Sequence, residues 1–197
     1  MVNKMKKLFV AVIFAIMAYS AGFEARACDS CNAPWSNVSR TFTIQGCVTV
    51  VDICFYCYVT EGKILVQICS FTRDTTCGLS PIELESAIAE YIATTYWVTL
   101  CGVTPCPATV DLYIYLPLCM GYSGGNPQTW SPCNDGMCER VYRICKDLDH
   151  VPPITKWDII SQSPSVEPSC TTDPPQNNDF LPGECYNFES QICTEIP

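Results

Sequence analysis

Apolar and polar side chains alternate along much of the chain, and this two-residue period predicts a protein built mainly from β-strands. The alternation is cleanest over residues 110–118, where Asp111, Tyr113 and Tyr115 fall on one side and aliphatic residues on the other. Because successive strand residues point to opposite faces, the aliphatic side is predicted to be buried and the two tyrosines to point outward. Other strands are predicted over 39–45, 46–71, 94–101, 138–145 and 154–160.

The longest of these stretches, residues 46–71, is predicted to be a hairpin that carries four cysteines. Its two apolar runs flank Glu61-Gly62, and glycine favours a tight reversal because it reaches positive φ without a Cβ clash. A two-residue loop would place Cys54 opposite Cys69, at a separation that a disulfide can span. Cys54 and Cys57 lie an odd number of positions apart, so in a strand they face opposite ways and are expected to have different partners.

One helix is predicted, and it begins at Pro81. Ser80 is suited to cap it, proline fits the first helical position, and Glu83 completes a capping box. Apolar residues at helical spacing then indicate one buried face. The predicted fold class is therefore mainly β, either a β-sandwich-like or a two-lobed β assembly, disulfide-rich, with one amphipathic helix and a Pro-rich C-terminal tail.

The chain is predicted to have three segments. Residues 1–27 have the Lys-rich start, the apolar run and the small-x-small cleavage site of a signal peptide. Residues 28–160 are predicted to form a disulfide-rich mainly-β domain, in which 31–72 and 106–145 show a faint similarity that suggests a duplicated unit. Residues 161–197 are rich in proline and lack periodicity, so an extended tail is expected.

Cleavage after residue 27 would leave Cys28 at the N-terminus, where some exported proteins carry a lipid anchor. Ala25 and Arg26 stand where such signals usually have an aliphatic and a small residue, so lipidation of Cys28 is not favoured. Beyond the signal, no stretch approaches the ~18 apolar residues that a membrane-spanning helix needs.

All sixteen cysteines lie after the predicted signal, and export would keep them as disulfides. The tail holds three, an odd number, so if all are paired at least one bonds to the body or to another chain. A chain of this length can bury a core without such staples, which indicates selection for durability outside the cell. The predicted framework consists of Cys28, Cys31, Cys47, Cys54, Cys57, Cys69, Cys77, Cys101, Cys106, Cys119, Cys133, Cys138, Cys145, Cys170, Cys185 and Cys193.

The formal net charge of −9 argues against nucleic acid and anionic membranes as partners. With a single histidine and an oxidising destination, the cysteines are not expected to hold zinc, and no cofactor is predicted. Charge and composition thus favour a soluble secreted protein without a metal centre.

Two short patterns resemble catalytic motifs but lack the context that such motifs need. Ser123 lies in a Gly-x-Ser-x-Gly pattern and is followed by Asp147 or Asp149 and by His150. A nucleophile elbow needs a helix directly after the serine, and the prolines that follow prevent one. The Cys-x-x-Cys pattern at Cys54 lies in a predicted strand instead of at a helix N-terminus. We therefore expect no enzymatic activity.

Tyr113 and Tyr115, with Trp130 in the following loop, are candidates for a surface that recognises a sugar or a partner protein. The alternative is that a second layer covers them, since large aromatic residues dominate protein cores.

These features favour a secreted structural or adhesive protein, located outside the cell or on its surface. It would be a self-assembling fibre, matrix or filament subunit that disulfides stabilise. Its expected partners are further copies of itself or other extracellular proteins, and carbohydrate is a further ligand class. One alternative is a monomeric extracellular module that binds carbohydrate or protein. The other, less favoured, is a small secreted serine hydrolase that uses Ser123 and His150.

Overall fold

The computed structural model describes residues 31, 33–102, 104–133, 136–175 and 179–193. The predicted signal peptide, and Cys28 with the question of its lipidation, lie outside these ranges. Within them, no helix is both long enough and apolar enough to cross a membrane.

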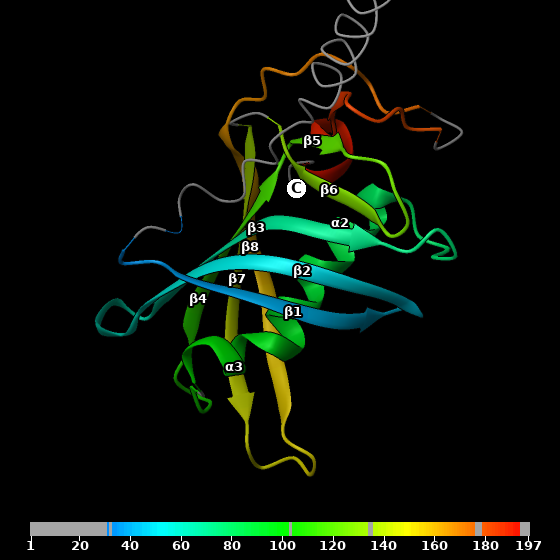
Figure 1. Cartoon of the computed structure of the whole chain (residues 1–197). Helices are drawn as coiled ribbons and strands as arrows, with labels where there is room; N and C mark the ends of the chain where they lie inside the picture. The colour runs from blue at the N-terminus through cyan, green and yellow to red at the C-terminus, as the bar shows by residue number, and fades with distance from the viewer. Residues whose placement is uncertain (1–30, 32, 103, 134–135, 176–178, 194–197) are drawn as a thin grey trace, which may run out of the picture.

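Strands account for most of the regular structure, as predicted, and one long helical segment packs against them (Figure 1). In chain order the elements are β1 (Ser36–Ile44), β2 (Cys47–Tyr58), η1 (Val59–Glu61), β3 (Lys63–Arg73), α2 (Pro81–Tyr91), η2 (Ile92–Tyr96), α3 (Trp97–Cys101), β4 (Val110–Pro117), β5 (Cys119–Tyr122), β6 (Gln128–Pro132), β7 (Met137–Asp147), β8 (Ile154–Val166), β9 (Cys185–Asn187) and α4 (Glu189–Ile192).

The nine strands form one sheet that divides into two arms beside β3. Strands β1, β2 and β3 are an antiparallel meander. The first half of β3 pairs in parallel with β4, which leads to β7 and β8, while its last residues pair with β6, which leads to β5 and β9. The described strands thus confirm the predicted mainly β class, and they form a single branched sheet. The stretches 31–72 and 106–145 differ in strand pairing, because the second contributes to both arms.

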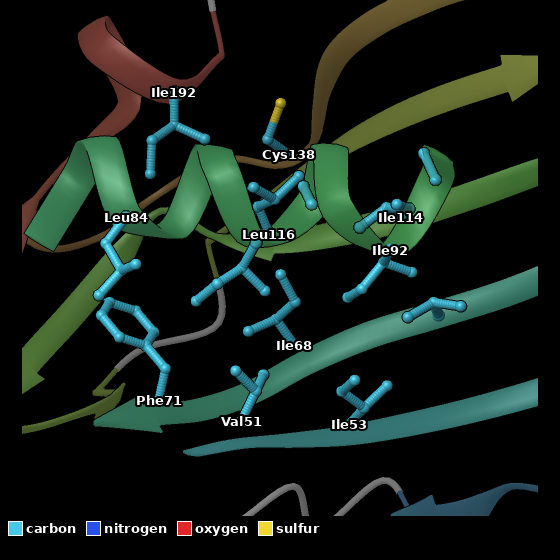
Figure 2. Packing of buried hydrophobic residues seen from close by; sticks show 14 of the residues in the cluster. Val51, Ile53, Ile68, Phe71, Leu84, Ile92, Ile114, Leu116, Cys138 and Ile192 are labelled. Atoms are coloured by element: carbon cyan, nitrogen blue, oxygen red, sulfur yellow. The ribbon is translucent and has the colours of Figure 1, made fainter. Parts of the chain in front are cut away.

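The helix α2 begins with the predicted capping box. The Glu83 backbone N–H donates to the Ser80 Oγ at 3.3 Å, and the Ser80 N–H donates to the Glu83 carboxylate at 2.7 Å. Figure 2 shows Leu84 and Ile92 directed from the helix toward the sheet, where apolar residues of β2 and β3 face them. The core therefore lies between the helix and one face of the sheet.

The segment 94–101 is helical, so the strand predicted there is wrong. Residues of η2 continue α2 with a wider helical turn, and α3 follows directly. The Trp97 side chain is fully buried, and Cys101 is bonded to Cys57 of β2. Packing of the helix on the sheet thus outweighs the strand preference of the threonines and aromatic residues in this stretch.

The predicted pairing of Cys54 with Cys69 is also wrong, because the hairpin loop is longer than two residues. Residues of η1 and Gly62 fill the loop, Tyr58 pairs with Lys63, and Cys54 consequently faces Gln67. A bulge beside Ile53 shifts the pairing again near Cys69. The two cysteines still share a face, with Sγ atoms 3.3 Å apart, but Cys54 is bonded to Cys31.

The C-terminal segment is fastened to the body of its own chain. Strand β8 runs to Val166, past the domain boundary predicted at residue 160, and β9 adds to the sheet beside β5. The three tail cysteines form the bridges Cys119–Cys170, Cys133–Cys185 and Cys138–Cys193. All three tail cysteines therefore bond to the body of their own molecule. We call the described part of this segment, residues 161–175 and 179–193, the strap.

Candidate binding face

One face of the sheet is not covered by the helix, and aromatic side chains gather on it. The pairing places Tyr56 of β2, Leu65 of β3 and Tyr113 of β4 in one row across three strands. These positions alternate with the buried residues Ile64 and Leu112, so they point away from the core. We call this surface the aromatic face; it consists of Trp35, Tyr56, Tyr58, Leu65, Tyr113 and Tyr115.

The rings on β2 contact one another. Those of Tyr56 and Tyr58 meet edge to face with centroids 4.2 Å apart, and that of Trp35 lies 6.4 Å from Tyr56. Tyr113 and Tyr115 are two positions apart on β4, which has neighbouring strands on both sides. All five aromatic side chains are partly exposed, so the face offers ring surface to a ligand.

A row of alternating charges borders the aromatic face on one side. Lys63 of β3 pairs with Asp111 of β4, which pairs with Arg143 of β7, which pairs with Asp158 of β8. We call these four residues the charged row. The Arg143 guanidinium donates to both carboxylate oxygens of Asp111, at 3.0 and 3.3 Å. These hydrogen bonds and the carboxylate charge raise the pKa of Arg143.

A polar row borders the face on the other side, where Tyr115 lies between Gln67 of β3 and Glu139 of β7. Burial, and then the hydrogen bond to the Glu139 carboxylate, raise the pKa of the Tyr115 hydroxyl well above its usual range. The hydroxyl is therefore protonated at any physiological pH and donates to Glu139. This contact fixes the orientation of the ring.

Two shallow hollows lie on the aromatic face and meet at Tyr115. One, of about 320 Å³, is lined by both β4 tyrosines together with Tyr58, Lys63 and other residues of the loop end. The other, of about 400 Å³, is lined by Tyr115 with Trp35, Glu139 and neighbouring residues. Each hollow thus combines ring surface with charged or amide groups at its border, which is the composition of small-molecule sites.

Of the three residues predicted to form a recognition surface, two lie on this face. Tyr113 and Tyr115 are half-buried there, as their outward positions in the strand predicted. Trp130 does not join them, because it is fully buried in the other arm. Its ring stacks on Tyr122 at 5.0 Å and meets Phe180 at 4.8 Å.

Sequence reasoning missed the aromatic residues from the N-terminal part of the face. Tyr56 and Tyr58 flank the inward-pointing Cys57. Because side chains alternate between the two faces of a strand, this spacing alone predicts that both tyrosines point outward. Trp35 precedes β1 outside any periodic pattern, and only the fold brings it to the hollow.

The candidate catalytic residues are not assembled into a triad. The Ser123 hydroxyl donates to the Thr129 carbonyl at 3.2 Å, in the loop after β5. His150 lies in the β7–β8 loop, where its Nδ1 is 2.9 Å from Asp147. Asp147 also pairs with Lys156 at 2.7 Å, and the hydrogen bond from this lysine is the main cause that lowers the pKa of Asp147. Figure 1 shows the ends of β5 and β7 at opposite ends of the molecule.

The cysteines of the described part of the chain are all oxidised, and none is free. Cys54 and Cys57 have the different partners that their spacing predicted, Cys31 and Cys101. Disulfides at this density are typical of an oxidising compartment. Two further bridges between described residues are Cys47–Cys77 and Cys106–Cys145.

Two groups of three cysteine sulfurs lie close enough together to invite comparison with metal sites. They are Cys31 with Cys54 and Cys69, and Cys119 with Cys170 and Cys185. Every one of these cysteines is disulfide-bonded, whereas a metal ligand must be a thiolate. Both groups are therefore places where neighbouring bridges pack side by side.

Comparison with known proteins adds no identity to this picture. No family model, curated protein or solved structure matches the chain. A functional assignment must therefore come from the chemistry of the aromatic face and the edges of the sheet.

Proposed function

We propose that this chain is an extracellular adhesive protein that binds neutral carbohydrate through its aromatic face. The observation that carries the proposal is the position of Tyr113 and Tyr115. They lie side by side on a central strand, partly exposed, at the meeting point of two hollows. The disulfides support an extracellular site of action, because such bridges persist in oxidising surroundings.

The chemistry of the face fits a sugar. The apolar C–H face of a sugar ring packs against an aromatic ring, while its hydroxyls need partners around the ring edge. Here Glu61 and Lys63 border one hollow, and Gln67 and Glu139 border the other. Since the hollows meet at Tyr115, the site has room for more than one sugar unit.

The charge of the protein favours a neutral ligand over an anionic one. The chain is acidic overall, and on the face itself Lys63 is paired with Glu61 at 3.3 Å, while Arg143 is paired with Asp111. An anionic glycan would meet few cations that lack a partner and would be repelled at long range.

The test is binding of the purified chain to a panel of neutral polysaccharides, followed by titration of the best ligand. Replacing Tyr113 or Tyr115 with alanine is expected to raise the Kd about two- to tenfold each, because stacking on one ring is worth roughly 0.5–1.5 kcal/mol. Phenylalanine at the same positions keeps the ring and should cost less. Leu181→Ala removes an exposed apolar side chain elsewhere and serves as the control.

Two results would contradict the proposal. One is the absence of binding across the panel. The other is equal affinity of the native chain and a double alanine variant at Tyr113 and Tyr115 that keeps its circular dichroism spectrum.

A further inference from the structure

Strand β8 is an open edge of the sheet. It is the last strand of its arm, it spans Ile154–Val166, and among the described strands it pairs only with β7. On its outer side, no strand of the described residues lies beside its backbone N–H and C=O groups. Natural proteins usually shorten or charge such edges, because an open edge templates pairing with another chain.

The first half of this strand is also unusually apolar for an edge. Ile154, Trp157, Ile159 and Ile160 are each between 37% and 44% exposed. Another edge of the sheet, β1, is different, since its exposed positions are mostly serine, threonine and asparagine. Exposed apolar residues on an open strand mark β8 as the edge suited to association.

The sequence of β8 is complementary to itself in one antiparallel register. A bulge leaves Ile160 without a partner on β7, so the regular part of the strand ends at Ile159. With Trp157 opposite Trp157 of a second copy, Lys156 faces Asp158 twice, and Thr155 faces Ile159 twice. Moving the centre of symmetry to Lys156 or to Asp158 places like charges opposite each other. Since opposite charges across a strand pair stabilise it and like charges destabilise it, the register centred on Trp157 is selected.

The charged row supports the same register. Asp158 is its outermost member, and its neighbour Arg143 is already hydrogen-bonded to Asp111. Lys156 of a second copy would stand on the free side of Asp158 and continue the alternation of charges across the junction. Its ammonium has three donors, so it can keep its own Asp147 and still reach the partner.

We propose that two copies of this chain pair edge to edge through the antiparallel segments 155–159, with Trp157 on the two-fold axis. Residues that pair directly point to the same face, so the two sheets join into one, and both aromatic faces lie on the same side of it. The pair is therefore bivalent for any ligand of that face. This inference does not rest on the proposed function, because it concerns the strand edge alone.

The experiment is sedimentation analysis of the native chain over a wide range of concentrations, with charge variants of β8. Asp158→Lys places lysine opposite lysine at two sites and is expected to raise the dimer Kd by about tenfold or more. The double variant Lys156→Asp/Asp158→Lys restores opposite charges in this register and should recover dimers. Asp149→Lys makes the same charge change in the exposed β7–β8 loop, outside the register, and should leave the Kd unchanged.

Circular dichroism and non-reducing gels check that each variant is folded, and Asp158→Asn provides a milder change with a smaller expected effect. A native chain that is monomeric at every concentration would overturn the proposal. So would association that Asp158→Lys leaves intact, or that Asp149→Lys weakens equally. Carbohydrate binding by the monomeric Asp158→Lys variant reports on the aromatic face separately.

Discussion

Glu85 should make the free energy of unfolding of this protein depend on pH between about pH 5 and 8, a range in which most proteins are near their maximal stability. Glu85 lies on α2, its side chain is fully buried, and neither carboxylate oxygen has a hydrogen-bond partner within the described structure. Burial raises the pKa of Glu85 well above the ordinary 4.5, although the nearby Arg140 guanidinium opposes this shift. The folded protein therefore holds a proton on Glu85 at pH values where the unfolded chain has released it.

The sign of the effect follows from this difference in proton binding. Above the unfolded pKa the native state binds more protons than the unfolded state, so the free energy of unfolding falls as pH rises. The stabilising contribution is complete below about pH 4.5 and is lost as pH rises through the raised pKa of the folded state. One proton gives a slope of at most about 1.4 kcal/mol per pH unit. Asp74, Glu83 and Asp147 have lowered pKa values and act in the opposite sense, at more acidic pH.

Guanidinium unfolding at several pH values between 5 and 8, with disulfides intact, measures this slope. Trp97 and Trp130 are fully buried, so their fluorescence reports the transition. In Glu85→Gln the slope should flatten, because glutamine does not titrate, while Glu90→Gln changes an exposed carboxylate of the same helix and should keep it. Parallel pH profiles for the native chain and Glu85→Gln would refute the reasoning.

Two further predictions concern stability. Gly136→Ala should lower the free energy of unfolding by about 1–3 kcal/mol, since a Cβ there would lie 2.6 Å from the Cα of Pro168 in the strap. Gly78→Ala, where a Cβ meets nothing within 4 Å, should be close to neutral, and equal melting temperatures of the two variants would contradict the packing of the strap. Ser80→Ala should cost about 1 kcal/mol in denaturant unfolding through loss of the helix cap, and Ser80→Thr should restore most of it; an unaffected alanine variant would contradict the capping box.

The parts of this fold that the sequence predicts are those that neighbouring residues determine. The alternation in β4 and the capping box at Ser80 are local patterns, and both have the predicted structure. The segment 94–101 has equally local strand signals, yet it is helical because Trp97 is buried in a core formed by distant strands. Propensity therefore fails where tertiary burial of one large side chain decides the conformation.

In the candidate site too, some features follow from local sequence and others depend on distant residues. The outward direction of Tyr113 and Tyr115 follows from the period of one strand. Trp130 lies in a stretch that the sequence predicts to be a loop, without such a period. It is fully buried in contact with Phe180, which comes from the C-terminal strap fifty residues later in the chain. The pairing of the cysteines is equally non-local, since each described bridge joins residues at least 23 positions apart.

Two of the disulfides lie at the borders of the aromatic face, for which we propose carbohydrate binding. Cys54 pairs with Gln67 at one border of the aromatic face, and its bridge to Cys31 fastens the N-terminal segment there. Cys145 lies beyond the charged row on β7, and its bridge to Cys106 fastens the chain before β4. The tyrosines of β4 lie between these two disulfide bridges. Bridges in these positions would leave the face little conformational freedom to lose on binding, so they support the carbohydrate binding that we propose.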